Sequence, residues 1–239
     1  MTNSIGRRLR FRPALAQSIA SVVLFLLLLS LGNWQLHRAG EKQALFAAID
    51  AALHAAAQPV SALQASSLPQ RASAAGRYEQ LPFLLDNRVR NGRAGYELLA
   101  PLQLADGRAV LVVLGWLPQG EDRAHLPSVT LPAGTVQLEG LALAPAAPPF
   151  ALSEREAFAS GWPKVVQTAV PAQLARVLGH SLLPLVIYPD GSEAALHELD
   201  ALHAFPPARH RAYAAQWFVM AGVLLLLYLR HGLRRGAAS

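Results

Sequence analysis

Residues 15–31 read LAQSIASVVLFLLLLSL, and no charged side chain occurs anywhere from Pro13 to Leu36. A helix of about 20 apolar residues crosses a hydrocarbon core of roughly 30 Å. We therefore expect residues 13–36 to form a transmembrane helix. A cleaved secretory signal is the alternative, because four Arg precede the run. The run exceeds the usual ~7 to 15 residues of such a signal, however, and no small-x-small cleavage site precedes Gly32.

A second uncharged run, residues 212–229, reads AYAAQWFVMAGVLLLLYL and is also long enough to span a membrane. The chain of 239 residues is 53% apolar, and the excess over a soluble protein lies in these two runs. The length leaves room for one domain of ordinary size between them. We expect residues 37–211 to form that domain.

The net charge of +6 comes from the two ends of the chain. Residues 1–12 carry four Arg and residues 230–239 carry three, whereas the segment between them holds 14 basic and 15 acidic residues. Nucleic-acid binding therefore loses its main support. Short Arg-rich flanks stay on the cytoplasmic side of a membrane. We expect both tails to be cytoplasmic, the membrane to be the cell inner membrane, and residues 37–211 to face the periplasm.

The predicted domain begins with a helical segment, residues 41–57, in which Leu45, Ile49 and Leu53 form one apolar stripe. Short apolar segments between turn residues then predict β structure. The expected strands are residues 74–78, 83–87, 96–104, 109–117, 135–141 and 183–188. Asp106-Gly107 is the best hairpin signal in the chain. A short helix is expected at residues 172–178, and residues 190–210 are expected to lead back to the membrane without regular structure. The fold class is α+β: two transmembrane helices flanking one mainly β domain with minor helices.

No residue pattern in the chain indicates catalysis, because it contains no HExxH, GxGxxG, GxxxxGK[ST] or GxSxG motif. The absence of Cys removes disulfides and thiolate ligands. His197 and His203 stand on an expected loop, where a surface role is favoured over metal binding. We therefore expect a protein that is not an enzyme.

His210 stands immediately before the second apolar run. An imidazole at the membrane boundary suits an axial haem ligand. The alternative is an interfacial His beside an aromatic belt of Tyr213, Trp217 and Trp34. The residues alone favour the interfacial role.

The segment LGNWQLHRAGEKQAL at the end of the first run resembles the entry motif of the surfeit-locus family of cytochrome c oxidase assembly factors. HRAYAAQWF is similar to the family's carboxy-terminal signature, and Trp162 and Pro184 are similar to its third segment. The central segment, GRYEQLPFLLDNRVRNGRAGYELLAPLQLADGRAVLVVLGWLP, resembles a succession of family motifs. Its matching residues are Gly76, Tyr78, Asn87, Gly95, Tyr96, Pro101, Leu102, Gly107, Gly115, Trp116 and Pro118. The Ala-, Leu- and Arg-rich composition favours a bacterial member, although a mitochondrial inner membrane would satisfy the same topology.

The resemblance implies a function in the biogenesis of haem-copper terminal oxidases and a role in handling haem a, with His210 as the ligand. It implies as partner the large subunit of the oxidase, with the haem a synthesis machinery as a further one. The residues carried over as neighbours of the haem are Tyr213, Gln216, Trp217, Trp34, Gln35 and Arg38, and Arg38 is expected to pair with a propionate. An interaction chaperone that acts through the β domain without haem is the alternative.

Two positions depart from the family pattern. Leu114 stands where the family has an arginine before the glycine-tryptophan pair. Arg209 and Arg211 stand where Asn and Leu usually flank the His. More basic surroundings favour an anionic ligand edge.

Overall fold

The computed structural model describes residues 9–11, 13–120, 125–145 and 161–235. The chain forms two compact units. One comprises the residues up to 46 and those from 204 onward, and the other comprises residues 47–203. The predicted Ala/Pro-rich loop around Pro148 and, in the two basic tails, residues 1–8, 12 and 236–239 lie outside the described residues.

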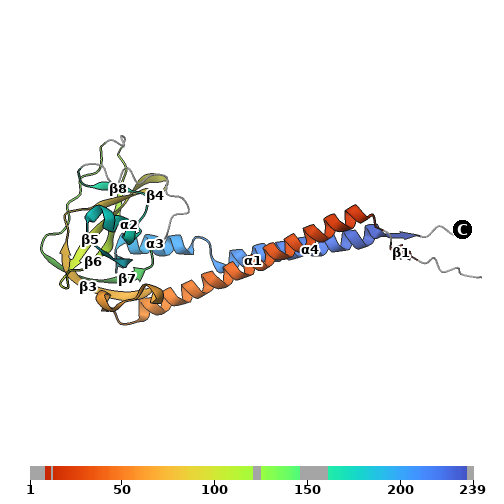
Figure 1. Cartoon of the computed structure of the whole chain (residues 1–239), viewed down its shortest axis with the longest axis horizontal. Coiled ribbons are helices and arrows are strands. Elements are labelled where there is room, and N and C mark those ends of the chain that lie inside the picture. The colour runs from red at the N-terminus through yellow and green to blue at the C-terminus, as the bar shows by residue number, and fades with distance from the viewer. Residues whose placement is uncertain (1–8, 12, 121–124, 146–160, 236–239) are drawn as a thin grey trace, which may run out of the picture. The chain divides into compact units, whose positions relative to one another are not determined.

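The first unit is built on two helices, α1 (Leu15–His54) and α4 (Pro207–Gly232). They run side by side in opposite directions (Figure 1), since Tyr228 of α4 donates a hydrogen bond to Ser18 of α1 and His210 lies against Gln35. Two short strands, β1 (Leu9–Phe11) and β10 (Leu233–Arg235), pair antiparallel beside these helices. Two helical stretches, which contain α1 and α4, are by length and composition able to cross a membrane.

Small residues line the contact between the two helices. Gly32, Ala39, Ala214 and Ala221 are buried there, and a Cβ atom added to Gly32 would lie 2.6 Å from the ring of Phe218. Small side chains let helices approach closely in a membrane. Large apolar side chains on the outer faces, such as Val22 and Leu226, are more than half exposed, as lipid contact requires.

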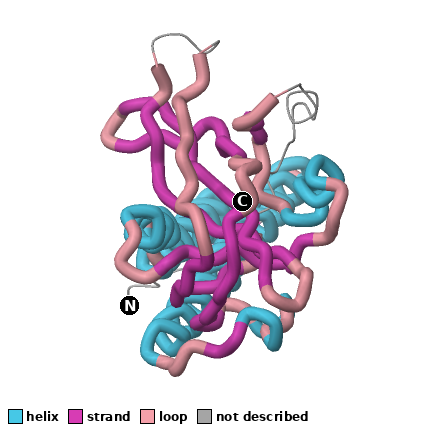
Figure 2. Tube along the Cα trace, turned by 90° about the vertical axis from the view of Figure 1, so that its left-hand side faces the viewer, coloured by secondary structure: helices cyan, strands magenta, loops and turns pink. Residues whose placement is uncertain are grey.

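The second unit is mainly β (Figure 2). Its strands are β2 (Gln58–Pro59), β3 (Gln70–Tyr78), β4 (Phe83–Arg90), β5 (Arg93–Leu104), β6 (Ala109–Pro118), β7 (Thr135–Leu143), β8 (Lys164–Val166) and β9 (Leu182–Pro189). Its helices are the short 3-10 turns η1 (Val60–Ala62) and η2 (Ala65–Ser67), then α2 (Pro171–Leu178) and α3 (Glu193–His203).

Five of the strands close into a ring in the order β3, β7, β9, β6, β5 and back to β3. Only β6 and β9 run parallel within that ring. Alternate residues of each strand point inward, as the period of a strand requires. The interior is filled by a cluster that includes Ala72, Ala74, Leu102, Leu104, Val110, Val112, Ala142, Leu185 and Ile187.

The closure of the barrel depends on Gly76. Gly76 pairs with Leu104 where β3 meets β5, and a Cβ atom there would collide with the backbone oxygen of Gln103. Three strands lie outside the ring: β2 pairs with β3, β4 pairs with β5, and β8 pairs with the far edge of β4.

The predicted fold class and all six predicted strands are confirmed, and each strand is longer than predicted by one to four residues. The expected helix at 41–57 continues α1, as predicted, and ends at His54. Leu53 is wrongly placed in its apolar stripe, because Leu53 is 37% exposed whereas Ile49 and Ala52 are buried. The expectation of irregular chain at 190–210 is wrong: α3 forms there, and α4 begins at Pro207 rather than at Ala212. His197 and His203 therefore lie on a helix and not on a loop.

Candidate functional site

His210 lies in the first turn of α4 and contacts α1 through one side chain. Its Nδ1 atom is 2.7 Å from Oε1 of Gln35, and both side chains are partly buried. A carbonyl oxygen can only accept a hydrogen bond, so with the Gln35 amide in this orientation the contact requires the proton on Nδ1 of His210. The structure thus brings together two of the residues that the sequence selected.

The ring of Phe205 also contacts the imidazole of His210. Its ring meets that of His210 edge to face at 4.5 Å and stacks on Tyr213 at 6.1 Å. Phe205 occupies the second position before the helix, and His210 is the fourth helical residue, which is the spacing of a hydrophobic staple. Sequence reasoning missed Phe205, although Pro207 at the first helical position signalled the helix start.

The remaining predicted site residues are placed as follows. Trp34 and Gln216 are exposed, and Trp217 is partly buried. Arg38 forms an ion pair with Glu41 at 2.7 Å, with its own side chain 55% exposed. The expected pairing of Arg38 with a propionate therefore requires Glu41 to give way.

Two Arg residues flank His210. The guanidinium of Arg209 lies over the ring of Phe205 at 5.3 Å, and Arg211 donates a hydrogen bond to Oε1 of Gln43 at 3.3 Å. Both side chains are exposed. The surroundings of the imidazole are therefore basic, as the sequence indicated.

The chemistry of this site fits a haem. Haem iron takes an imidazole nitrogen as an axial ligand. In the part of the chain that the structure describes, His210 Nδ1 is engaged by Gln35 and Nε2 has no hydrogen-bond partner. The aromatic rings of Phe205 and Tyr213 and the cations of Arg209 and Arg211 suit an apolar macrocycle with anionic edges.

The central motif residues of the β unit have structural roles. Trp116 donates its indole N–H to the backbone oxygen of Arg88 at 2.8 Å. Asn87 has a φ of +60° at a bulge in β4, where Asp86 accepts its backbone N–H, and Asn tolerates this left-handed conformation. Leu114 stands at the register shift between β5 and β6 and packs against the barrel core.

Two buried charged side chains, Glu97 and Arg90, each lie near a more exposed charge of opposite sign. The Glu97 carboxylate is 4% exposed and its Oε2 is 3.4 Å from Arg88 Nε, while Arg90, 7% exposed, lies 2.7 Å from Glu193 of α3. Neither contact has the geometry of a hydrogen bond. Burial raises the pKa of the Glu97 carboxyl, and Arg88 opposes this shift. Burial, with the nearby carboxylates of Glu198 and Glu97, also raises the pKa of Tyr188.

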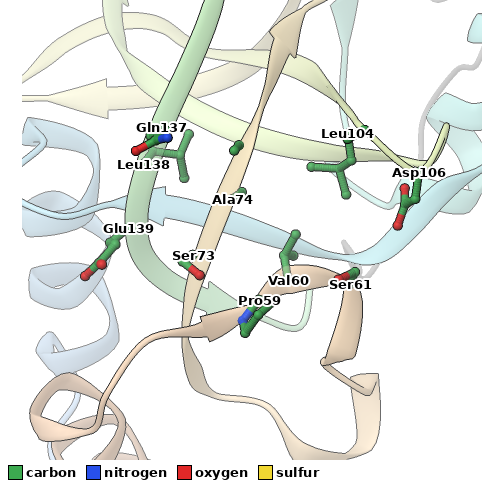
Figure 3. Close-up of a pocket in the computed structure, with 12 residues that line it drawn as sticks. Pro59, Val60, Ser61, Ser73, Ala74, Leu104, Asp106, Gln137, Leu138 and Glu139 are labelled. Carbon is green, nitrogen blue, oxygen red and sulfur yellow. The ribbon is translucent and has the colours of Figure 1, made fainter.

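A cavity of about 580 Å³ opens at the seam of the barrel (Figure 3). On this edge of β3, β2 pairs with Ala72 and Ser73, and β5 pairs with the residues from Gly76 onward. Ala74 and Ala75 therefore have no strand partner on this edge. Asp106 and Glu139 line opposite sides of the cavity. Hydrogen bonds from Arg108 lower the pKa of Asp106, and Arg71 lies 3.0 Å from Glu139.

The fold and the site define a class of protein with two apolar helices and one β-barrel domain. The candidate histidine site of this class is formed between the two helices. Residues 22–222 match the model of the SURF1 family. The chain belongs to that family.

Two relatives are similar to part of the chain. A SURF1-like protein of Rickettsia felis is 28% identical over 131 residues, which cover 48% of this chain and 57% of that relative. A SURF1-like protein of Monosiga brevicollis is 30% identical over 126 residues, which cover 46% of this chain and 48% of that relative. The chain thus spans about half the length of the relatives it matches.

Proposed function

We propose that this chain is an assembly factor for a haem-copper terminal oxidase, and that it holds haem a at His210 and delivers it to the large subunit. Membership of the SURF1 family supports the assembly role. The observation that carries the haem step is the half-buried imidazole of His210, which is held through Nδ1 by Gln35. The haem, when bound, supplies an iron that takes the remaining ring nitrogen.

His210 and the residues around it would each make a different kind of contact with the haem. His210 provides the ligand nitrogen, and Phe205 with Tyr213 provides an apolar wall against a porphyrin face. Three guanidinium groups near the imidazole are available to pair with propionates. Arg209 and Arg211 flank His210 on α4, and Arg38 lies about one helical turn after Gln35 on α1. Bonds between guanidinium and carboxylate are strong because both partners are charged.

The site is proposed to lie at the outer edge of the inner membrane. From His210 to Tyr228 α4 rises about 27 Å at 1.5 Å per residue, which is close to the hydrocarbon thickness of a bilayer. The hydrogen bonds of His210 with Gln35 and of Tyr228 with Ser18, which lie toward opposite ends of α4, then mark the two boundaries of the hydrocarbon core. Both Arg-rich tails face the cytoplasm and the β domain faces the periplasm.

The natural absence of Cys allows a direct test of this orientation. Ala75→Cys introduces one thiol at an exposed position of the β unit, and Ala238→Cys introduces one in the carboxy-terminal tail. A membrane-impermeant maleimide should label only the first in cells with a permeabilised outer membrane. Labelling of Ala238→Cys but not Ala75→Cys would reverse the orientation.

The haem step is tested by the absorption spectrum of the full chain purified from cells that make haem a. His210→Ala should lose at least about tenfold in bound haem, since the axial ligand is gone. His37→Ala is the matched control, because His37 is an exposed histidine two residues after Gln35 on α1. Its Nδ1 atom contacts the backbone oxygen of Asn33 in the same helix. Equal haem in the wild type and in His210→Ala would remove His210 as the ligand.

The cavity at the barrel seam favours a second candidate, an interaction chaperone that holds a segment of the oxidase subunit without haem. Ala75→Trp would fill the cavity from an exposed position. Under this alternative the variant loses association with the oxidase subunit in pull-down from membranes. Under the haem-delivery proposal its haem content stays unchanged.

A further inference from the structure

Neutral imidazole carries its proton on only one of its two ring nitrogens, and the other nitrogen holds the lone pair that can bind a metal. The hydrogen bond made by one nitrogen decides which tautomer is present. In water the tautomer protonated at Nε2 is the more populated one. A histidine that must offer Nε2 to a metal therefore benefits from an acceptor fixed at Nδ1.

Gln35 is that acceptor for His210. The distance of 2.7 Å between Oε1 and Nδ1 is short for a hydrogen bond between neutral groups. The two residues come from different helices, so the bond fixes the ring relative to both. If the amide were turned about, its NH₂ group would instead donate to Nδ1 and force the proton onto Nε2, which would block that nitrogen.

Phe205 adds a restraint on the plane of the ring. Its edge-to-face contact with His210 has an interplanar angle of 63°, and the ring of Tyr213 stacks on that of Phe205 at an interplanar angle of 8°. Rotation of the imidazole about its Cβ–Cγ bond would break both the aromatic contact and the bond to Gln35. One nitrogen and one ring orientation are thereby selected.

We propose that Gln35 is a positioning residue that holds His210 as the Nδ1–H tautomer and leaves the Nε2 lone pair open for a haem iron. The metal-binding part of this inference rests on the proposed function, whereas the tautomer itself does not. Gln35 does not touch the iron in this arrangement. It acts only through His210.

The first test needs no haem. The full chain, labelled with ¹⁵N-histidine in detergent micelles, is measured by long-range ¹H–¹⁵N NMR at a pH at which the ring is neutral, and His210→Ala assigns the signal. Wild-type His210 should show the Nδ1–H pattern, and Gln35→Leu should shift it toward Nε2–H. Gln43→Leu is the matched control, because Gln43 lies on the same helix and binds Arg211 instead.

The second test measures affinity for haem a by absorbance titration of the same proteins. Loss of a second-shell partner typically weakens metal binding about 10- to 100-fold, which we expect for Gln35→Leu. Gln35→Glu keeps an acceptor oxygen and should retain wild-type affinity within about threefold. Gln17→Leu, which changes an exposed glutamine near the start of α1, should retain wild-type affinity as well.

The outcomes separate the two proposals. An Nε2–H pattern for His210 in the wild type, or no change of pattern in Gln35→Leu, overturns the role of Gln35 whether or not haem binds. The Nδ1–H pattern together with no binding of haem a by the wild type confirms the tautomer and overturns the haem function. Equal affinity in Gln35→Leu and wild type, where haem does bind, also overturns the positioning role.

Discussion

The helical unit and the β unit differ in what holds them together. The barrel of the β unit closes on itself around apolar side chains such as Leu102, Val112 and Ile187, which are fully buried. The helices α1 and α4 instead meet through small residues and through side-chain hydrogen bonds, two of them around His210 and one at Tyr228. Burial of apolar area stabilises the barrel in water, whereas packing of small residues and lipid contact stabilise the helix pair.

This difference separates stability from function. The candidate ligand His210 lies in the helical unit, whose polar groups at the helix ends can meet water or a cofactor. The β unit carries most of the residues matched to the family's central motifs, yet Trp116 and Asn87 serve the fold of the sheet there. Substitutions in the barrel should therefore change the free energy of unfolding, and substitutions between the helices should change the affinity for haem a.

The largest effect is expected for Gly76→Ala. Its Cβ atom would collide with the backbone of Gln103, where side-chain rotation offers no relief, so the seam of the barrel must open. We expect a loss of about 3 kcal/mol or more in the free energy of unfolding. Urea unfolding followed by tryptophan fluorescence measures it. Gly115→Ala is the control, since a Cβ atom there meets nothing within 4 Å; equal losses in both variants would contradict the closure of β3 on β5.

The second effect tests the helix pair. Gly32→Leu places a side chain against Phe218, which would force α1 and α4 apart. We expect at least about tenfold weaker binding of haem a, because Gln35 and His210 must stay within hydrogen-bond distance. The urea midpoint of the β unit should not change. Gly40→Leu, on the same helix with open space around it, should bind haem normally; a parallel loss in that variant would remove the packing explanation.

The third effect is a pH dependence of the β unit. Burial raises the pKa of Glu97 above its unfolded value near 4.5, so between the two values the folded state binds more protons and stability falls as the pH rises. Glu97→Gln should flatten this fall, which is at most about 1.4 kcal/mol per pH unit for one group. Asp106 has the opposite sign, because Arg108 lowers its pKa below 3.8 and its contribution is lost only in more acidic solution. Identical slopes above pH 4.5 for the wild type and Glu97→Gln would refute the buried-acid explanation.

The smallest effect concerns the ion pair of Arg38 with Glu41. Exposed pairs are worth about 0.2 to 1 kcal/mol, so Glu41→Gln should leave stability nearly unchanged. If Arg38 serves a propionate, its release should tighten binding of haem a by up to about fivefold. Asp50→Asn, an exposed acid further along α1, should not change affinity. Weaker binding in Glu41→Gln would argue against Arg38 as a propionate partner.

Local patterns in the sequence predicted the helices and strands well. Uncharged runs predicted the apolar helices, and turns such as Asp106-Gly107 separated the strands where the structure has them. The helix α3 was missed because its eleven residues lie between turn residues and Pro206-Pro207, and because Ala194 is its only fully buried residue. Ser192, whose hydroxyl oxygen accepts the N–H of Ala195, was the available signal for its start.

Contacts between distant residues could not be predicted in the same way. Alternation shows which face of β3 is buried but not that β5 closes the ring at Gly76. The candidate site was selected at His210 and Gln35 by resemblance, and its geometry depends on the packing of two segments about 175 residues apart. Phe205 was missed because it precedes the apolar run, although its spacing from His210 fits a staple.

One variant tests directly whether the helix pair holds the haem. Residues 47–203 are replaced by a flexible Gly/Ser linker, so that residues 15–46 of α1, the segment from Ala204 to Phe205 and all of α4 remain. The protein is purified from the membranes of cells that make haem a. The account predicts the haem a spectrum of the intact chain, and its loss when His210→Ala is added. A membrane-inserted variant without haem, beside an intact chain that retains it, would contradict the account.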